Sequence, residues 1–238
     1  MQKAAYKRIL LKISGEALAG AKGFGIDNKT LNTIVSCIME VYHLGVQTAI
    51  VVGAGNFWRG REGQDMDRST ADHMGMLGTV INSLALQDAI EKHGVETRVM
   101  TAIQMNRIAE PYIRRKAVSH LENKKIVIFA CGTGNPFFST DTAAALRAAE
   151  IDADIILYAK NVDGIYTEDP KKNPKAKKFD RLTYHEVISK KLEAIDMTAA
   201  SLCMDNNMPS LLFTIDEPKN IIDAVMGRNI GTVIENSD

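Results

Sequence analysis

Short runs of apolar residues alternate with helical segments along this chain of 238 residues. The clearest apolar runs are residues 6–14, 46–53, 125–132 and 154–160. Runs that are apolar at nearly every position are typical of parallel strands that are covered on both faces. Between the first two runs, in residues 30–45, apolar residues recur at helical spacing. This alternation predicts an α/β fold with a mostly parallel central sheet.

Three further segments continue the pattern. We expect a strand over residues 95–102 and a helix over 110–122, with Pro111 in the first turn of that helix. Residues 72–92 are helical in pattern and apolar on more than one side. A helix of that kind lies in a core or at an interface.

The composition of the chain changes after residue 161. A charged loop with a hairpin-like Asp163-Gly164 comes first, and then helices and strands alternate again to the end. We therefore expect one continuous domain over residues 1–238, with two lobes at approximately 1–160 and 161–238.

Charge and cysteine content argue against several classes of protein. Lys plus Arg equals Asp plus Glu at 29 each, so no global basic field favours nucleic acid or an anionic membrane. The three cysteines, Cys37, Cys131 and Cys203, are far apart, as is typical of free thiols in the cytoplasm. No apolar run approaches the ~18 residues of a membrane span. We expect a cytoplasmic protein that needs neither membrane nor nucleic acid.

Glycine-rich turns follow several predicted strands, at Gly15, residues 53–55 and residues 132–134. Ligands of parallel sheets bind at the carboxyl ends of the strands. Glycine leaves backbone N–H groups open to a phosphate there, and the next helix adds its positive end. The chain has no Gly-Lys dipeptide and hence no Walker A loop. Gly60 comes five residues after Gly55, which weakens a dinucleotide fingerprint.

Charged side chains beside these turns each allow two interpretations. Lys12 is either an edge lysine that extends its ammonium group to water or a cation aimed at a phosphate. Arg59 either follows an ordinary turn or grips a phosphate together with backbone amides. Asp72 ends the stretch 69–72, which has the spacing of a capping box, or else accepts hydrogen bonds from ribose hydroxyls.

The stretch 129–152 combines a strand end, a glycine-rich break and a helix start. Ser139 or Thr140 as N-cap and Asp141 in the first turn are explained by capping alone. An anion seat is the alternative, in which Asp141 is useful only beside Mg²⁺ or a lysine. Together with Lys12, the phosphate-binding turns and Asp141 have the composition of a phosphoryl-transfer site.

Six segments of the chain match a known family: KRILLKISGEAL, VVGAGNFWRG, DHMGML, GTGNPFFSTDTAA, AKNVDGIYTEDP and DNNMP. On these segments the chain resembles the bacterial uridylate (UMP) kinase family of the amino acid kinase superfamily. The resemblance implies a three-layer αβα sandwich, a homohexamer and a cytoplasmic enzyme of pyrimidine biosynthesis. It also implies transfer of the γ-phosphoryl group of MgATP to UMP, with GTP as activator and UTP as inhibitor.

The resemblance also implies roles for individual residues, with the acceptor nucleotide in the first lobe and ATP in the second. Catalytic roles fall on Lys12, Arg59, Asp141 and Asp196. The ATP-binding positions are Lys12, Ile13, Ser14, Gly15, Gly55, Arg59, Lys160, Asn161, Tyr166 and Asp169. The UMP-binding positions are Ala54, Asp72, Thr133, Gly134, Asn135, Pro136, Phe137, Phe138, Ser139 and Thr140. The response to GTP maps to Gly20, Ala21, Lys22, Gly23, Phe24 and Gly25. The alternative interpretation of this segment is a simple mobile connection.

Two structural expectations accompany these roles. Ala54 stands where many members have glycine, so its φ should be negative. One of Phe137 and Phe138 should belong to the core. No general base is needed, because the second pKa of a phosphate monoester is ~6 and the acceptor oxygen is already anionic at pH 7. Asp141 and Asp196 should act on Mg²⁺, through water, with no direct protein ligand. The alternatives are a carboxylate or carbamate kinase and a non-catalytic nucleotide-binding regulator.

Overall fold

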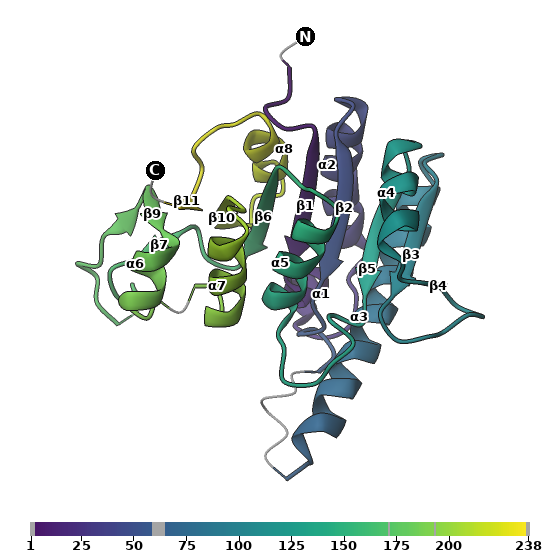
Figure 1. Ribbon diagram of the computed structural model, residues 1–238, viewed down its shortest axis with the longest axis horizontal. Helices are drawn as coiled ribbons and strands as arrows, with labels where there is room; N and C mark the ends of the chain where they lie inside the picture. Colours follow the sequence, from purple (N-terminus) through teal and green to yellow (C-terminus); the bar gives the residue numbers. More distant parts are fainter. Residues whose placement is uncertain (1–2, 59–64, 171, 193, 237–238) are drawn as a thin grey trace.

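The computed structural model describes residues 3–58, 65–170, 172–192 and 194–236. Within these residues, one sheet holds nine strands in the order β4-β3-β5-β2-β1-β6-β10-β11-β9 (Figure 1). Every pairing in it is parallel except that of β10 with β11. The strands are β1 Arg8–Ile13, β2 Gln47–Val52, β3 Thr97–Thr101, β4 Glu110–Pro111, β5 Ile126–Ala130, β6 Ile155–Lys160, β9 Arg181–Thr183, β10 Ser210–Thr214 and β11 Thr232–Glu235.

Helices cover both faces of this sheet. The pleat of β1 sends Ile9 and Leu11 into one apolar cluster, shared with α1, α2, α3 and α8, and Leu10 into another, shared with α4 to α7. The helices are α1 Gly15–Ala19, α2 Asn28–His43, α3 Arg68–Glu91, α4 Arg114–Glu122, α5 Thr140–Glu150, α6 Tyr184–Ser189, α7 Met197–Asp205 and α8 Asn220–Val225, with a 3-10 turn η1 at Gly20–Lys22. The predicted three-layer αβα sandwich is confirmed.

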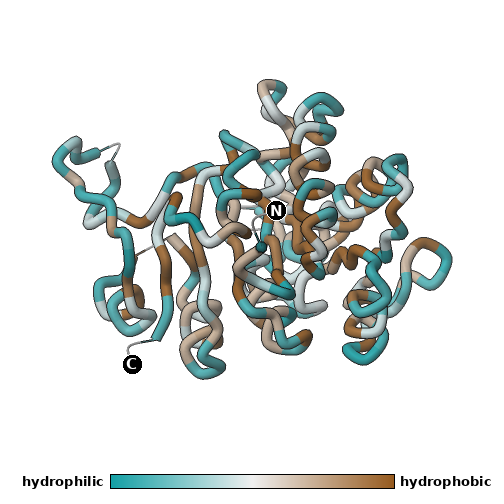
Figure 2. The backbone as a smooth tube through the Cα atoms, turned by 90° about the horizontal axis from the view of Figure 1, so that it is seen from above, coloured by the Kyte–Doolittle hydropathy of each residue, from teal (hydrophilic) through white to brown (hydrophobic). Residues whose placement is uncertain are grey.

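Apolar residues concentrate in the strands at the middle of the molecule, and hydrophilic residues lie in the outer loops (Figure 2). A small separate hairpin pairs β7, Ile165–Tyr166, with β8, Lys178–Phe179. Asp163 and Gly164 precede β7, so they are not the turn of this hairpin. None of the helices in the described parts of the chain has the length and apolarity needed to span a bilayer.

Two local expectations were wrong. Pro111 does not begin a helix: Glu110–Pro111 forms the edge strand β4, and the helix starts at Arg114. Proline is tolerated at a sheet edge because the missing N–H group is not needed there.

The second wrong expectation is the capping box over residues 69–72. Helix α3 begins at Arg68, and its N-cap is Asp67, whose carboxylate accepts a hydrogen bond from the Thr70 N–H group at 2.8 Å. Asp72 therefore lies one turn inside the helix, and its carboxylate is available for another role.

Candidate active site

A cavity of about 390 Å³ opens at the carboxyl ends of β1, β2 and β5, between the starts of α1 and α5 and the first half of α3. It unites the three glycine turns that were predicted from the sequence. Its lining residues are Lys12, Ser14, Gly15, Glu16, Gly53, Ala54, Gly55, Trp58, Arg68, Asp72, Gly75, Met76, Thr79, Gly132, Thr133, Asn135, Phe138, Ser139 and Thr140.

Lys12 lies on β1, which is a central strand between β2 and β6. It is 7% exposed, so the interpretation as an edge lysine is wrong. Its ammonium nitrogen lies 2.9 Å from Oδ1 of Asp141 in the first turn of α5. Lys160, at the end of β6, donates a hydrogen bond to the other carboxylate oxygen of Asp141 at 2.6 Å and another to the Ala194 carbonyl. The fold thus builds a buried Lys12–Asp141–Lys160 cluster.

The electrostatics of this cluster favour an ionised aspartate. Burial by itself would raise the pKa of Asp141, but the ammonium groups of Lys12 and Lys160 hold that pKa well below its ordinary value. Burial lowers the pKa of Lys160, and the charge of Asp141 opposes that effect. Two ammonium groups face one carboxylate, so the protonated cluster carries a positive charge beside the cavity. That charge is suited to a phosphate group.

Asp196 lies at the same end of α5 but does not join the cluster through an ion pair. It is the N-cap of α7 and accepts hydrogen bonds from the Ala199 N–H group at 3.0 Å and the Thr142 hydroxyl at 3.0 Å. The Ser139 hydroxyl also donates to it. Ser139 in turn caps α5, because its Oγ accepts from the Asp141 N–H group at 3.0 Å. Capping and the predicted site therefore share the same residues.

The glycine turns after β1 and β2 touch each other through their backbones. A Cβ atom at Gly15 would lie 2.5 Å from the Gly53 carbonyl oxygen and 2.6 Å from the Gly55 nitrogen. Only glycine at position 15 permits this approach. Ala54 is not among the described residues with positive φ, as its extra methyl group requires. A Cβ atom at Gly78 would lie 2.9 Å from that methyl group, so α3 packs closely over the turn.

Asp72 faces the loop that follows β5. Its Oδ2 accepts hydrogen bonds from the Phe137 N–H group at 2.8 Å and from Nε of Arg68 at 2.9 Å. Phe137 has φ +72°, and its ring lies 5.7 Å from the Arg68 guanidinium carbon. Phe137 is 68% and Phe138 50% exposed, so the expectation that one of them is core was wrong. Both follow Pro136 on a loop beyond the sheet, where no layer covers them.

Several predicted ATP residues lie elsewhere. Arg59 lies outside the described residues. Tyr166 donates a hydrogen bond to the Asp163 carboxylate at 2.9 Å, and neither Tyr166 nor Asp169 lines the 390 Å³ cavity. Asn161 lines a second cavity of about 660 Å³, together with Gly20 and Ala21.

Sequence reasoning missed part of the cavity wall, namely Glu16, Trp58, Arg68, Gly75, Met76 and Thr79. Helical spacing from Asp72 would have found three of these residues, because Gly75, Met76 and Thr79 share its face of α3. Thr79 also holds the loop after β5, since its hydroxyl oxygen accepts from the Cys131 N–H group at 2.8 Å. Cys131 has φ +64°. Arg68 stands one turn before Asp72 on the same face, but the helix was expected to begin only at residue 72, and for Glu16 and Trp58 the sequence offers no comparable signal.

Residues 7–214 match the model of the amino acid kinase family. The chain belongs to the amino acid kinase family. Among solved structures, this amino acid kinase is similar to UMP kinase from Bacillus anthracis, with 42% identity, a TM-score of 0.94 and coverage of 98% of this chain and 97% of the other. UMP kinase from Ureaplasma parvum is 38% identical, with a TM-score of 0.91 and coverage of 99% and 100%. Uridylate kinase from Archaeoglobus fulgidus is 27% identical, with a TM-score of 0.74 and coverage of 95% and 99%.

Proposed function

We propose that this amino acid kinase transfers the γ-phosphoryl group of ATP to UMP, giving ADP and UDP, in the cytoplasm and as a step of pyrimidine nucleotide biosynthesis. The observation that carries the proposal is the single cavity in which Lys12, the two touching glycine turns, Asp72 and the loop after β5 meet. The similarity to UMP kinases over almost the whole chain supports the same acceptor.

The acceptor lies in the first lobe, residues 1–160, and ATP extends towards the second, residues 161–238. Of the predicted UMP positions, Ala54, Asp72, Thr133, Asn135, Phe138, Ser139 and Thr140 line the cavity. Oδ2 of Asp72 already holds the loop, so Oδ1 is the oxygen that accepts from a ribose hydroxyl. Of the ATP positions, Ser14, Gly15 and Gly55 also line the cavity, and in this proposal they take the phosphates.

The chemistry is a transfer between two anions. An oxygen of the UMP phosphate forms a bond to the γ-phosphorus, and the bond from that phosphorus to the β–γ bridging oxygen breaks, so that ADP leaves. UMP needs no base because its phosphate is a dianion above pH ~6. The obstacle is charge repulsion, which Lys12, Lys160 and the amides of the glycine turns reduce.

Mg²⁺ accompanies ATP in this proposal. Oδ1 of Asp141 is buried and forms an ion pair with the Lys12 ammonium at 2.9 Å. A carboxylate oxygen has more than one lone pair, so Asp141 fits a role in holding a water ligand of the ion, and Asp196 is the second carboxylate that we assign to it. Among the described residues, no group of three His, Cys, Asp or Glu side chains could hold a metal ion directly. When bound, Mg²⁺ neutralises charge on the β- and γ-phosphates.

A second copy of the chain covers the exposed face of α3. The N-terminal part of α3 projects beyond the sheet (Figure 1). Met74, Leu77 and Ile81 share one face of it and are 37%, 50% and 49% exposed. Three large apolar side chains at this spacing support an interface between subunits, and we propose a homohexamer built on it.

Regulation by GTP and UTP is the remaining part of the proposal. Residues 20–25 carry the response to GTP. Gly23 and Gly25 have positive φ with open space around them, and Phe24 is 67% exposed. These features support a segment that changes conformation when an effector binds.

Release of ADP from MgATP tests the function, with UMP, CMP, carbamate and N-acetylglutamate offered singly. We expect turnover with UMP alone. Turnover with carbamate or N-acetylglutamate instead would indicate a carboxylate or carbamate kinase, and nucleotide binding without ADP release would indicate a regulator. Addition of GTP or UTP to the UMP reaction then tests activation and inhibition, and sedimentation velocity tests the hexamer.

A further inference from the structure

Two asparagine side chains form a closed pair beneath the turn that follows β2. Asn56 is 1% exposed and Asn82, on α3, is 0% exposed. The Asn56 amide nitrogen donates to the Asn82 amide oxygen at 2.9 Å, and the Asn82 amide nitrogen donates back to Asn56 at 2.7 Å. Each side chain therefore recognises the other through both a donor and an acceptor.

The second N–H of each amide bonds a glycine carbonyl outside the pair. Asn82 donates to the Gly53 carbonyl at 2.7 Å, and Asn56 donates to the Gly25 carbonyl at 2.7 Å. The backbone N–H group of Gly25 also donates a hydrogen bond to the backbone carbonyl of Asn56 at 2.9 Å. An amide group has two N–H donors, so all four donors of the pair are used. Fully satisfied buried networks of this kind rigidify one arrangement.

The Gly53 carbonyl connects the rigid asparagine pair to the wall of the cavity. The same oxygen would lie 2.5 Å from a Cβ atom at Gly15, and Gly53 itself lines the cavity beside Ala54 and Gly55. A small shift of Gly53 therefore moves both glycine turns. Because misplacement of reacting groups by about 1 Å can cost ~10²-fold in rate, the position of this carbonyl matters for transfer.

We infer that Asn56 and Asn82 are positioning residues for phosphoryl transfer, which set the turn at Gly53–Gly55 through the Gly53 carbonyl and tie residues 20–25 to it. The inference rests on the proposed function and deepens it. Neither side chain lines the cavity. Both nucleotides still bind through their bases and riboses when the pair is broken, so the defect lies in alignment of the phosphates.

The test is Asn82→Leu in the full chain, with Asn82→Asp as a second variant of the same size in case the first does not fold. We expect the kcat for MgATP and UMP to fall at least about tenfold, while both KM values stay within about threefold. Hydrogen exchange of residues 53–58 should rise in the absence of nucleotide. The matched control is Ser83→Ala, which removes a buried polar group on the same helix that bonds only the Thr79 carbonyl of that helix.

A kcat within twofold of the wild type in both Asn82 variants would overturn the inference. Unchanged exchange of residues 53–58, an equal loss of kcat in Ser83→Ala, or KM values that rise in proportion to the loss would overturn it as well. Failure of the wild-type chain to phosphorylate UMP would refute the proposed function instead, and the exchange measurement would still test the pair. Asn56→Leu should raise exchange over residues 20–27 more than Asn82→Leu does.

Discussion

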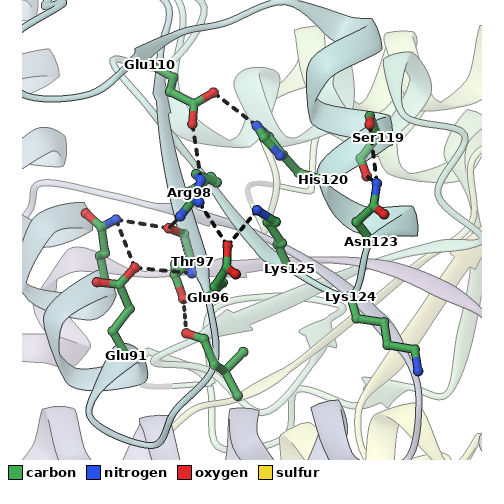
Figure 3. A network of polar contacts seen from close by, with 12 residues as sticks. Glu91, Glu96, Thr97, Arg98, Glu110, Ser119, His120, Asn123, Lys124 and Lys125 are labelled. Atoms are coloured by element: carbon green, nitrogen blue, oxygen red, sulfur yellow. Dashed lines mark hydrogen bonds and ion pairs between the residues drawn. The ribbon is translucent and has the colours of Figure 1, made fainter.

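Two charge clusters in this molecule pair basic side chains with carboxylates in different surroundings. In the first, Lys12, Asp141 and Lys160 meet under the cavity, with side chains that are 8%, 11% and 17% exposed. In the second, Arg98 lies between Glu96 and Glu110 near one edge of the sheet, at 2.9 and 3.3 Å (Figure 3). Lys125 and His120 extend it, and Glu96 is 62% exposed.

The difference between the clusters lies in what water does for each of them. The side chains of the second cluster, here called the surface cluster, are 20–62% exposed, so water solvates them, each pair contributes little and salt screens it. In the buried cluster little of each side chain is exposed to water, and two ammonium groups share one carboxylate. Water already stabilises the charges of the surface cluster. The buried cluster has two ammonium groups for one carboxylate, so it keeps a positive charge that a bound anion can neutralise. The predictions that follow test this contrast, from the largest effect to the smallest.

The largest effect is expected for Asp141→Asn. It leaves the ammonium groups of Lys12 and Lys160 without the carboxylate that pairs with both, and breaking a buried ion pair in this way costs about 3–5 kcal/mol. Urea denaturation at neutral pH measures the loss in free energy of unfolding. A loss no larger than that of a surface variant would show that the cluster is solvated and that the contrast is wrong.

The pH dependence of that loss has a definite sign. Lys12 and Lys160 hold the pKa of folded Asp141 well below that of an unfolded aspartic acid, which is about 3.9. Its stabilisation is therefore complete above that unfolded value and disappears as the pH falls through the lower folded value. We expect the gap between wild type and Asp141→Asn to narrow below about pH 4. A gap that widens there would contradict the lowered pKa.

Lys12→Ala tests the catalytic side of the contrast. It removes one of the cations that face the transferred group, and loss of one such contact costs about 10²–10³ in kcat. The KM for UMP should change little, because Asp72 and the loop after β5 remain. Steady-state kinetics measures both constants, and equal turnover in the variant would end the role of Lys12.

Asp72→Asn should raise the KM for UMP about tenfold, the effect of ~1.4 kcal/mol of lost binding. It weakens acceptance from the ribose and the hold on Phe137 together, and it leaves the glycine turns after β1 and β2 unchanged. Arg68→Ala is the comparison variant, because it removes one partner of Oδ2 and leaves the carboxylate and its hydrogen bond from the Phe137 N–H group. If only the KM for ATP moved in Asp72→Asn, the two nucleotide sides would be reversed.

The smallest effect is expected for Lys125→Gln in the surface cluster. It removes an exposed ion pair with Glu96, 2.5 Å long, and should leave the melting temperature within about 2 °C of the wild type. Raising the salt concentration should remove even that difference. A loss comparable to that of Asp141→Asn would mean that burial does not distinguish the clusters.

Much of the fold was predictable because it follows from local patterns in the sequence. The apolar strands and the helix of residues 30–45 fold as their periodicity predicts, and the glycine turns lie at the carboxyl ends of the strands. The errors occurred where local signals compete. Pro111 is compatible with both a helix start and an edge strand, and the pairing of β4 with β3 decided between them.

The candidate site was only partly readable. Lys12 and Asp141 were predicted as members, but their ion pair with Lys160 depends on β6 lying next to β1, which no local pattern states. The amides of Asn56 and Asn82 are ordinary polar residues until α3 packs over the turn after β2. Exposure of Phe137 and Phe138 likewise depends on what lies above their loop.

Sequence by itself determined the layers, the glycine turns and the presence of a lysine within a buried strand, since each of these follows from residues close together in the chain. Tertiary structure decided which charges meet and which amides close into a pair. Those contacts join residues separated by 19 positions, as in Asp141 and Lys160, or by 26, as in Asn56 and Asn82. Electrostatic and hydrogen-bond energies depend on distance and on burial, and only the packed sheet and helices set both.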